Sequence, residues 1–327
     1  MKKFICHALW IISAPCSFAT FATTINFSPY ADLTINARWD STYQDMEPMD
    51  LLKISQESGI KSYHLAFITD AGNCQPAWGA ESSYGVHQLW GKHLADKLQA
   101  AHISTIVSFG GANGNDVSMA CSEDQLIALF DKVMTAYQPI GLDFDIENGT
   151  AQVEKLVNAL IKTQTKYPLK KLSFTLPVMP EGLTYQGESI IKEAMRKRGD
   201  QTLIFTVNIM AMDYGSAYNG DMGQYAISAA NNVFNFIKRI ATEKSDKDIW
   251  QMIEVTPMIG VNDVNILQFT LTNVDTLRDF AQQKALGGLS MWSVARDRPC
   301  SDKWASPICS GNNLQTMPYE FSKRFLK

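Results

Sequence analysis

Three carboxylates alternate with apolar residues between positions 143 and 147. Asp143, Asp145 and Glu147 are separated by Phe144 and Ile146, and the apolar segment 139–142 precedes them. Alternate side chains of a β-strand point to the same side and lie about 6.6 Å apart, so these carboxylates should form one row. Like charges this close cannot all ionise freely, which raises at least one pKa toward the value that a proton donor needs near neutral pH. The row therefore predicts acid catalysis.

Two other interpretations of the row are a solvated edge strand and a metal site. An edge strand is disfavoured because Phe144, Ile146 and the residues before the row are apolar, which is typical of a strand covered on its other face. Carboxylates do suit magnesium or calcium. However, no histidine lies near the row, and a row along one strand does not surround an ion. We therefore expect neither a metal nor a cofactor.

The first 22 residues have the pattern of a secretory signal peptide. Two lysines near the start are followed by an apolar run and then by small residues, so cleavage after Ala19 or Ala22 fits. We expect a soluble mature protein, residues 23–327, that is secreted to the periplasm or the medium. No later run is long and apolar enough to cross a bilayer, so no membrane span is predicted.

The charge and the cysteine content of the chain limit its possible partners and indicate its redox compartment. The chain has 29 basic and 33 acidic residues, and loss of the leader removes two lysines, which makes the formal net charge about −6 and disfavours nucleic acid as a partner. Cys74, Cys121, Cys300 and Cys309 remain, and an oxidising compartment favours two disulfides. The spacing favours Cys300 with Cys309 and Cys74 with Cys121, although four cysteines allow three pairings.

Apolar, β-branched segments alternate along the chain with segments of helical periodicity. The expected strands are residues 24–30, 62–69, 104–109, 141–147, 171–177, 205–212, 251–259 and 287–293. Eight βα units predict one closed parallel barrel, and about 305 residues suffice for a single core. No linker or repeat indicates a second domain, and we expect a monomer. Such barrels place their chemistry at the carboxyl ends of the strands, where the acidic row, residues 212–214, residues 108–111 and Trp292 all fall.

Four strand-end motifs resemble those of the family 18 glycoside hydrolases, the chitinase family. Residues 141–147 resemble the strand-four signature DxxDxDxE, residues 108–111 resemble SxGG on strand three, residues 210–214 resemble the strand-six Met/Asp/Tyr element, and Trp292 resembles the tryptophan after strand eight. The resemblance covers the mature chain and implies a (β/α)8 TIM barrel. Residues 262–286 are too short for the α+β insertion domain that many exo-acting relatives carry between strands seven and eight, so we expect an open groove and internal cleavage.

The resemblance implies hydrolysis of β-1,4 bonds between N-acetylglucosamine units, with the substrate's own acetamido oxygen as the nucleophile. It makes Glu147 the acid and gives Asp145, with Asp143 beneath it, the task of orienting the acetamido nitrogen. Tyr214 would bind the acetamido carbonyl. The expected substrate contacts are Asp213, Met212, Trp292, Tyr30, Ser108 and Gly110, and Asp32 is a further candidate beside Tyr30. The expected partner is chitin or an N-acetylglucosamine oligosaccharide.

One position departs from the family pattern, and three functions stay open. Ile140 replaces the first aspartate of the signature, which in the family lies at the base of the row, so we expect the replacement to change how Asp143 and Asp145 share a proton.

The candidate functions are a secreted chitinase, an endo-N-acetylglucosaminidase acting on glycoprotein glycans or peptidoglycan, and a carbohydrate-binding protein without turnover. The retained Glu147 favours an enzyme.

Overall fold

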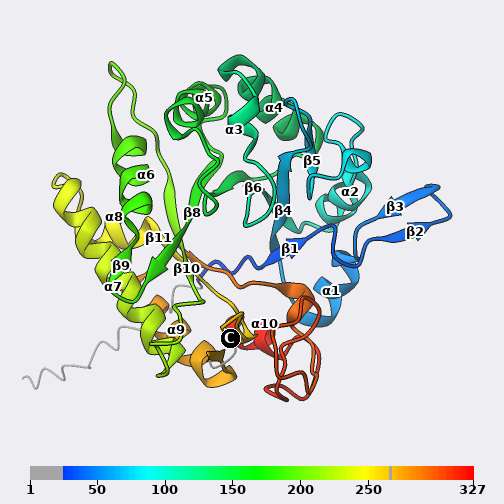
Figure 1. Ribbon diagram of the computed structural model, residues 1–327, viewed down its shortest axis with the longest axis vertical. Coiled ribbons are helices and arrows are strands. Elements are labelled where there is room, and N and C mark those ends of the chain that lie inside the picture. The colour runs from blue at the N-terminus through cyan, green and yellow to red at the C-terminus, as the bar shows by residue number, and fades with distance from the viewer. Residues whose placement is uncertain (1–24, 265–266) are drawn as a thin grey trace, which may run out of the picture.

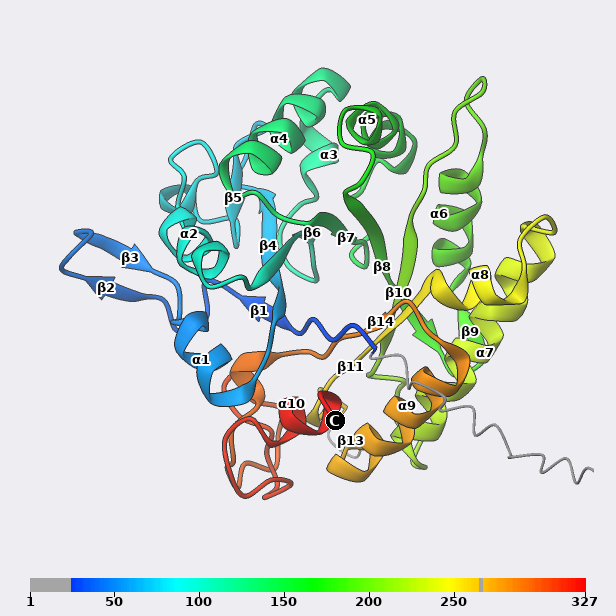
Figure 2. The same cartoon turned by 180° about the vertical axis from the view of Figure 1, so that it is seen from behind.

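Eight parallel strands form a barrel in a computed structural model that describes residues 25–264 and 267–327 (Figures 1 and 2). In their order around the barrel the strands are β1 (Tyr30–Asp32), β4 (Ser62–Asp70), β6 (Ser104–Gly110), β7 (Gly141–Asp145), β8 (Lys171–Met179), β10 (Thr206–Ala211), β11 (Ile253–Pro257) and β14 (Gly288–Leu289). Each neighbouring pair in this order is parallel. The expected TIM barrel is confirmed.

The barrel closes between β14 and the residues around the start of β1. Phe27 and Leu289 form a parallel bridge, and the Ser28 amide donates to the Leu289 carbonyl at 3.0 Å. The Tyr30 amide donates to the Met291 carbonyl, also at 3.0 Å. Backbone pairing of the first strand therefore begins within the predicted segment 24–30, and it places Tyr30 and Trp292 at the same end of the barrel.

Helices surround the barrel (Figures 1 and 2). They are α1 (Leu51–Ser58), α2 (Lys92–Ala100), α3 (Val117–Ala120), α4 (Glu123–Ala136), α5 (Val153–Lys166), α6 (Tyr185–Met195), α7 (Met222–Ile240), α8 (Asp246–Gln251), α9 (Leu271–Lys284) and α10 (Glu320–Phe325). Local sequence explains their starts: Ser122 and Gln125 form a capping box at α4, and Asp221 caps α7 by accepting from the Gln224 amide. No helix of the described residues is long and apolar enough to cross a membrane.

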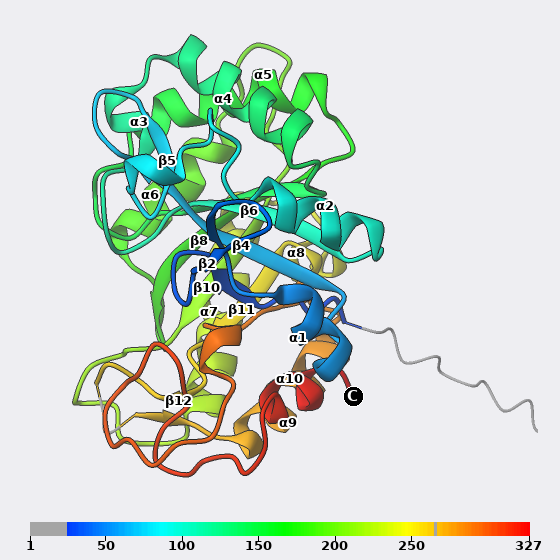
Figure 3. The ribbon, with the colours of Figure 1, turned by 90° about the vertical axis from the view of Figure 1, so that its right-hand side faces the viewer.

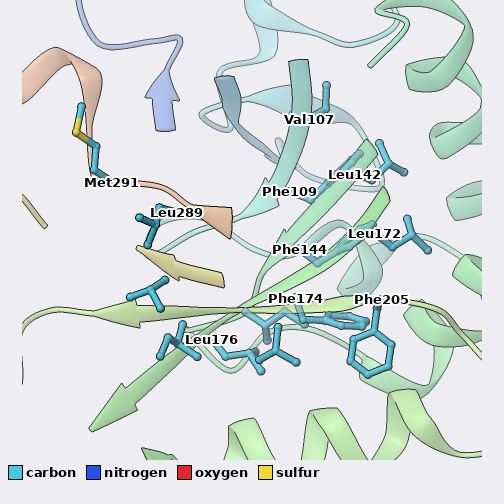
Figure 4. Close-up of a cluster of buried hydrophobic side chains, with 14 of the residues drawn as sticks. Val107, Phe109, Leu142, Phe144, Leu172, Phe174, Leu176, Phe205, Leu289 and Met291 are labelled. Carbon is cyan, nitrogen blue, oxygen red and sulfur yellow. The ribbon is translucent and has the colours of Figure 1, made fainter. Parts of the chain in front are cut away.

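An aromatic layer fills the space between the strands and the helices (Figure 4). Phe109, Phe144 and Phe174 occupy paired positions on β6, β7 and β8, and the Phe109 and Phe144 rings stack at 5.3 Å. Phe130 of α4 meets the edges of both rings at 5.4 Å. Because side chains alternate along a strand, this outward aromatic layer leaves Asp143 and Asp145 of β7 facing the barrel interior.

Shorter elements complete the carboxyl end of the barrel. They are the β2 (Arg38–Asp40) and β3 (Asp45–Glu47) hairpin, β5 (Pro76–Trp78), the 3-10 turns η1 (Ser82–Tyr84) and η2 (Val294–Arg296), β9 (Gly182–Leu183), β12 (Gly260–Val261) and β13 (Gln268–Phe269). β5 pairs antiparallel with the end of β4 and extends it as a wall. In the described part of the connection from β11 to β14, a two-stranded hairpin and α9 take up the chain, so the expected lack of an α+β domain there is confirmed.

Two disulfides tie loops together, with the pairings that the spacing favoured. Cys74 bonds Cys121 across 47 residues and links the β4–β5 turn to the end of α3. Cys300 bonds Cys309 within the segment between η2 and α10, which Figure 3 shows beside β12. The predicted signal peptide, residues 1–22, lies outside the described residues.

Candidate active site

A cavity of about 390 Å³ lies at the carboxyl ends of the barrel strands. Every strand contributes to it, either directly or through the residues that follow the strand. The lining residues are Tyr30, Asp32, Thr34, Phe67, Thr69, Gly79, Gly110, Ala112, Asn113, Asp145, Glu147, Thr175, Met210, Met212, Asp213, Thr256, Met258, Asp263 and Trp292. Eight of the eleven candidate site residues named from the sequence, Asp32 included, are among them, so most of the candidate site converges in one place.

The carboxylate row runs from this cavity into the barrel. Glu147 stands two residues beyond the end of β7 and is half-buried, whereas Asp145 is 5% exposed and Asp143 is fully buried. Alternation along β7 produces the row, as the sequence predicts. Each carboxylate therefore has a different environment, which allows each to have a different task.

Asp143 at the bottom of the row is held by four hydroxyl groups. Tyr30 Oη at 2.8 Å and Ser108 Oγ at 2.6 Å donate to its Oδ2. Ser173 Oγ at 2.6 Å and Thr175 Oγ1 at 2.8 Å donate to its Oδ1. Both oxygens are thereby fixed. Ser108, predicted as a substrate contact, supports Asp143 and is not among the residues that line the cavity.

Asp145, the next carboxylate of the row toward the cavity, lacks the hydrogen bonds that hold Asp143. Its Oδ1 is buried and has no hydrogen-bond partner among the residues that the structure describes, although Asp145 lines the cavity. Burial, together with the charges of Glu147 and Asp143, raises its pKa well above the ordinary value of an aspartate. An unpaired buried oxygen is costly unless a ligand supplies a donor. Asp145 is therefore placed to accept a hydrogen bond from a bound molecule.

Glu147 is the most exposed carboxylate of the row. Burial and the charge of Asp213 raise its pKa, which favours the protonated acid. The next residue anchors the turn, because Asn148 Nδ2 donates to the carbonyls of Gly111 at 3.0 Å and Gly114 at 2.8 Å. The side chain of Glu147 thus projects from a backbone that is tied to the loop after β6.

Gly110 allows β6 to approach the end of β7. Its φ is +92°, and a Cβ atom on it would lie 2.1 Å from the Asp145 carbonyl oxygen. The amide of Gly111 donates to that same oxygen at 3.0 Å. No residue with a side chain fits this contact without moving the backbone of Asp145.

Three aromatic rings line the side of the cavity formed by β1, β4 and β14. The Trp292 and Phe67 rings stack at 5.7 Å, and Tyr30 lies 6.2 Å from Trp292. The Ala66–Phe67 and Trp292–Ser293 peptide bonds are cis. These rings provide a flat apolar surface of the kind that packs against the apolar face of a ring-shaped ligand.

Asp213 joins the site to the loop after β12. Its Oδ1 accepts from the amides of Asp263 at 2.8 Å and Val264 at 3.3 Å, and its own amide donates to Asn262 Oδ1 at 3.2 Å. Burial and the charge of Asp263 raise the pKa of Asp213. Met212, directly before it, also lines the cavity.

Arg296 is a buried residue that contacts the backbone around β12, next to Asp213 and Asp263. Its guanidinium donates to the carbonyls of Ile259 at 3.0 Å and Val261 at 2.6 Å, and the residue is 2% exposed. Burial lowers the pKa of Arg296 to about 10, although the charges of Asp263 and Asp213 act in the opposite direction. The guanidinium therefore neutralises part of the nearby negative charge without lining the cavity.

Tyr214 does not lie where the predicted carbonyl contact requires it. It is 3% exposed, is not among the lining residues, and packs between Tyr218 at 5.9 Å and Tyr225 at 5.9 Å. The reason is the backbone at Asp213, whose φ of +50° breaks the strand alternation after Met212. Met212 and Asp213 are consequently the part of the strand-six motif that reaches the cavity.

Ile140 does not lie at the base of the row, where the expected change in proton sharing would require it to lie. It precedes Gly141, the first residue of β7, and is 39% exposed. Its place in the alternation is that of Leu142 and Phe144, whose side chains lie outside the barrel. A carboxylate at position 140 would point away from Asp143.

Several cavity residues were not predicted as site residues from the sequence. They are Thr34, Phe67, Thr69, Gly79, Ala112, Asn113, Thr175, Met210, Thr256, Met258 and Asp263. Phe67 and Thr69 fall near the end of a predicted strand, so their position was a usable signal. Asp263 follows β12, and its contact with Asp213 joins residues 50 positions apart, which no local pattern indicates.

Comparison with curated sequences identifies two relatives, whereas no protein-family model matches. The chain is 30% identical over 319 residues to a probable bifunctional chitinase/lysozyme of Escherichia coli (strain K12), covering 91% of this chain and 34% of that protein. It is 30% identical over 296 residues to endochitinase 11 of Metarhizium anisopliae, covering 84% of this chain and 53% of that protein. The chain thus spans about a third and about half of their lengths.

Among solved structures, the fold and sequence match active domain 2 of a chitinase from Pyrococcus furiosus. The identity is 35% and the TM-score is 0.78, and the alignment covers 93% of this chain and 94% of that domain. The same domain has also been solved in complex with chito-oligosaccharides, with 34% identity and a TM-score of 0.78.

Proposed function

Because this chain belongs to the family 18 glycoside hydrolases, we propose that it is a secreted chitinase that hydrolyses β-1,4 bonds between N-acetylglucosamine units. The observation that carries this proposal is the pairing of Glu147, a carboxylic acid with a raised pKa, with Asp145, whose buried Oδ1 lacks a partner. Such a pair suits a substrate that needs one proton donor and one acceptor for an N–H group. The related Pyrococcus domain was solved with chito-oligosaccharides, which supports this substrate class.

In the proposed reaction, Glu147 donates its proton to the glycosidic oxygen as the bond to the anomeric carbon breaks. The acetamido oxygen of the same sugar attacks that carbon and forms an oxazolinium ion. The unpaired Oδ1 of Asp145 accepts the acetamido N–H, which holds the acetamido oxygen toward the anomeric carbon. Glu147, now deprotonated, takes a proton from the water that opens the oxazolinium ring. The configuration at the anomeric carbon is therefore retained.

Asp213 takes the part that the sequence assigned to Tyr214. Burial and the charge of Asp263 raise its pKa, and the backbone amides of the β12–β13 loop occupy its Oδ1. A protonated Oδ2 can donate a hydrogen bond to the acetamido carbonyl oxygen. Trp292 and Phe67 form the surface on which the sugar ring packs.

Secretion, cleavage within chains and a monomeric state belong to the same proposal. The two disulfides support export, because such bonds persist in oxidising compartments. The short connection between β11 and β14 leaves the cavity without the added domain wall, which supports internal attack on oligosaccharides.

The test is to incubate the mature protein with an N-acetylglucosamine hexamer and to follow the products and their anomeric form by chromatography. We expect early release of β-anomeric dimers, trimers and tetramers. Sequential release of dimers from one end would contradict internal attack. A lack of any product would contradict the chitinase proposal, and cleavage of a denatured glycoprotein under the same conditions would favour the endo-N-acetylglucosaminidase alternative.

A further inference from the structure

Every charged residue that lines the cavity is acidic. Asp32, Asp145, Glu147, Asp213 and Asp263 contribute five carboxyl groups, and no lysine, arginine or histidine of the described residues shares the lining. Asp145 and Glu147 are assigned to the reaction, and Asp213 to the acetamido group. Asp32 and Asp263 have no task in the proposed chemistry, although both face the space that the substrate must occupy.

In the strand order, these two carboxylates lie on either side of Trp292. Asp32 ends β1 and Asp263 follows β12, whereas Trp292 follows β14, which pairs with β11 and closes the barrel against the first strand. Asp32 is rigidly held, because its Oδ1 accepts from the Thr34 amide at 2.9 Å and from the Thr34 hydroxyl at 2.7 Å. The backbone of Asp263 is held by its bond to Asp213. The carboxylate of Asp32 and the backbone of Asp263 are thus held in place at the lining of the cavity.

Arg296, the cation that acts on Asp213 and Asp263, is not available to a ligand. Arg296 is 2% exposed and uses its guanidinium on backbone carbonyls, and it is not among the lining residues. The chain as a whole also carries a formal net charge of −4. Like charges near a protein surface repel each other, and the repulsion falls with distance. An anionic substituent is therefore repelled both on approach and in the cavity.

We propose that this cavity selects its substrate by charge, favouring chains that carry a glucosamine ammonium group beside the cleaved unit over chains that carry a carboxylate there, and that Asp32 and Asp263 set this preference. The inference rests on the proposed chitinase function. The cleaved unit itself must keep its acetyl group, because its oxygen is the nucleophile. The favoured substrate class is accordingly partly deacetylated chitin, and polymers of N-acetylmuramic acid are disfavoured.

The experiment compares kcat/KM for three substrates at low salt: the N-acetylglucosamine hexamer, the same hexamer with one glucosamine next to an acetylated unit, and soluble glycan strands that contain N-acetylmuramic acid. We expect the singly deacetylated hexamer to exceed the neutral one by about tenfold, which corresponds to about 1.4 kcal/mol. Raising the salt from about 0.01 M to about 1 M shortens the Debye length from about 30 Å to about 3 Å and should bring the ratio toward one.

Asp32→Asn and Asp263→Asn should each lower the ratio of cationic to neutral substrate by about threefold, and the pair should lower it further. Asp200→Asn is the matched control, because Asp200 is exposed and lies outside the cavity lining; it should leave the ratio unchanged. Circular dichroism checks that each variant folds. A ratio that neither the two cavity variants nor salt alters, or cleavage of the muramic acid strands as fast as the hexamer, would overturn the inference.

Failure of the proposed function can be told apart from failure of this inference. Calorimetric titration of Glu147→Gln with the neutral and the singly deacetylated hexamer measures charge selection without any turnover. Tighter binding of the cationic chain, weakened by Asp32→Asn in the same background, would support the selection even if the wild type released no product. Equal binding of the two chains would contradict it.

Discussion

Replacement of Gly110 by alanine should damage both stability and catalysis, for reasons that can be separated. The residue has φ +92°, and an added Cβ would lie 2.1 Å from the Asp145 carbonyl oxygen. A side chain in a left-handed conformation costs roughly 1–2 kcal/mol. Overpacking of a rigid contact costs about 1–3 kcal/mol more. We therefore expect Gly110→Ala to lower the free energy of unfolding by about 2–5 kcal/mol, a large part of the usual net stability.

Gly215→Ala isolates the first of these two costs. Gly215 has φ +91°, but no atom lies within 4 Å of the position its Cβ would take. Urea denaturation of both variants should therefore show a smaller loss for Gly215→Ala, about 1–2 kcal/mol. The difference between the two variants measures the contact with the backbone of Asp145.

The same contact predicts a catalytic effect. To relieve the clash, the end of β7 must move away from β6, and Asp145 and Glu147 move with it. A displacement of about 1 Å can cost roughly 100-fold in rate. We expect kcat on the hexamer to fall by that order for folded Gly110→Ala. Equal unfolding free energies for the two alanine variants, together with an unchanged kcat, would refute this reasoning.

Three further predictions concern the buried carboxylate, a disulfide and a tyrosine. The pKa of Asp145 is raised in the folded state, so this carboxyl favours folding below the ordinary aspartate pKa, and that contribution is lost as the pH rises through the raised value. In urea titrations, Asp145→Asn should therefore raise the free energy of unfolding by about 0.5–2 kcal/mol at pH 7 and should not raise it at pH 3. The same variant should lose most of its activity. Replacing Cys74 and Cys121 by serine should cost about 4 kcal/mol by the same titration, since the bond closes a 47-residue separation; a loss below about 1 kcal/mol would contradict that estimate. Tyr214→Phe should change kcat/KM by less than about twofold, or about 0.4 kcal/mol, because the hydroxyl is buried away from the cavity lining; a hundredfold loss would return it to the reaction.

The sequence predicts the parts of this site that follow regular geometry. Alternation along one strand is enough to place Asp143, Asp145 and Glu147 in a row, and the barrel pattern brings Trp292 and Met212 to the same end. These predictions succeed because strand periodicity holds wherever the backbone stays extended.

The remaining features depend on irregular backbone or on distant contacts. The positive φ of Asp213 turns Tyr214 out of the cavity, and nothing in the residue types announces that break. Asp263 reaches the site only because its loop folds back on Asp213, 50 residues away. Ile140 is different, since counting the alternation from Asp143 already places its side chain outside the barrel.

The assignment of Glu147 as the acid is tested most directly by comparing Glu147→Gln with the wild type on two substrates that differ in the leaving group. One is the N-acetylglucosamine hexamer, whose leaving sugar must be protonated, and the other is a dinitrophenyl glycoside, whose leaving phenolate needs no proton. General acid catalysis is worth about 10²–10⁴ in rate, so the hexamer reaction should fall by that factor, whereas the dinitrophenyl reaction should fall by less than about tenfold. Equal losses on both substrates, or full activity on the hexamer, would contradict the assignment.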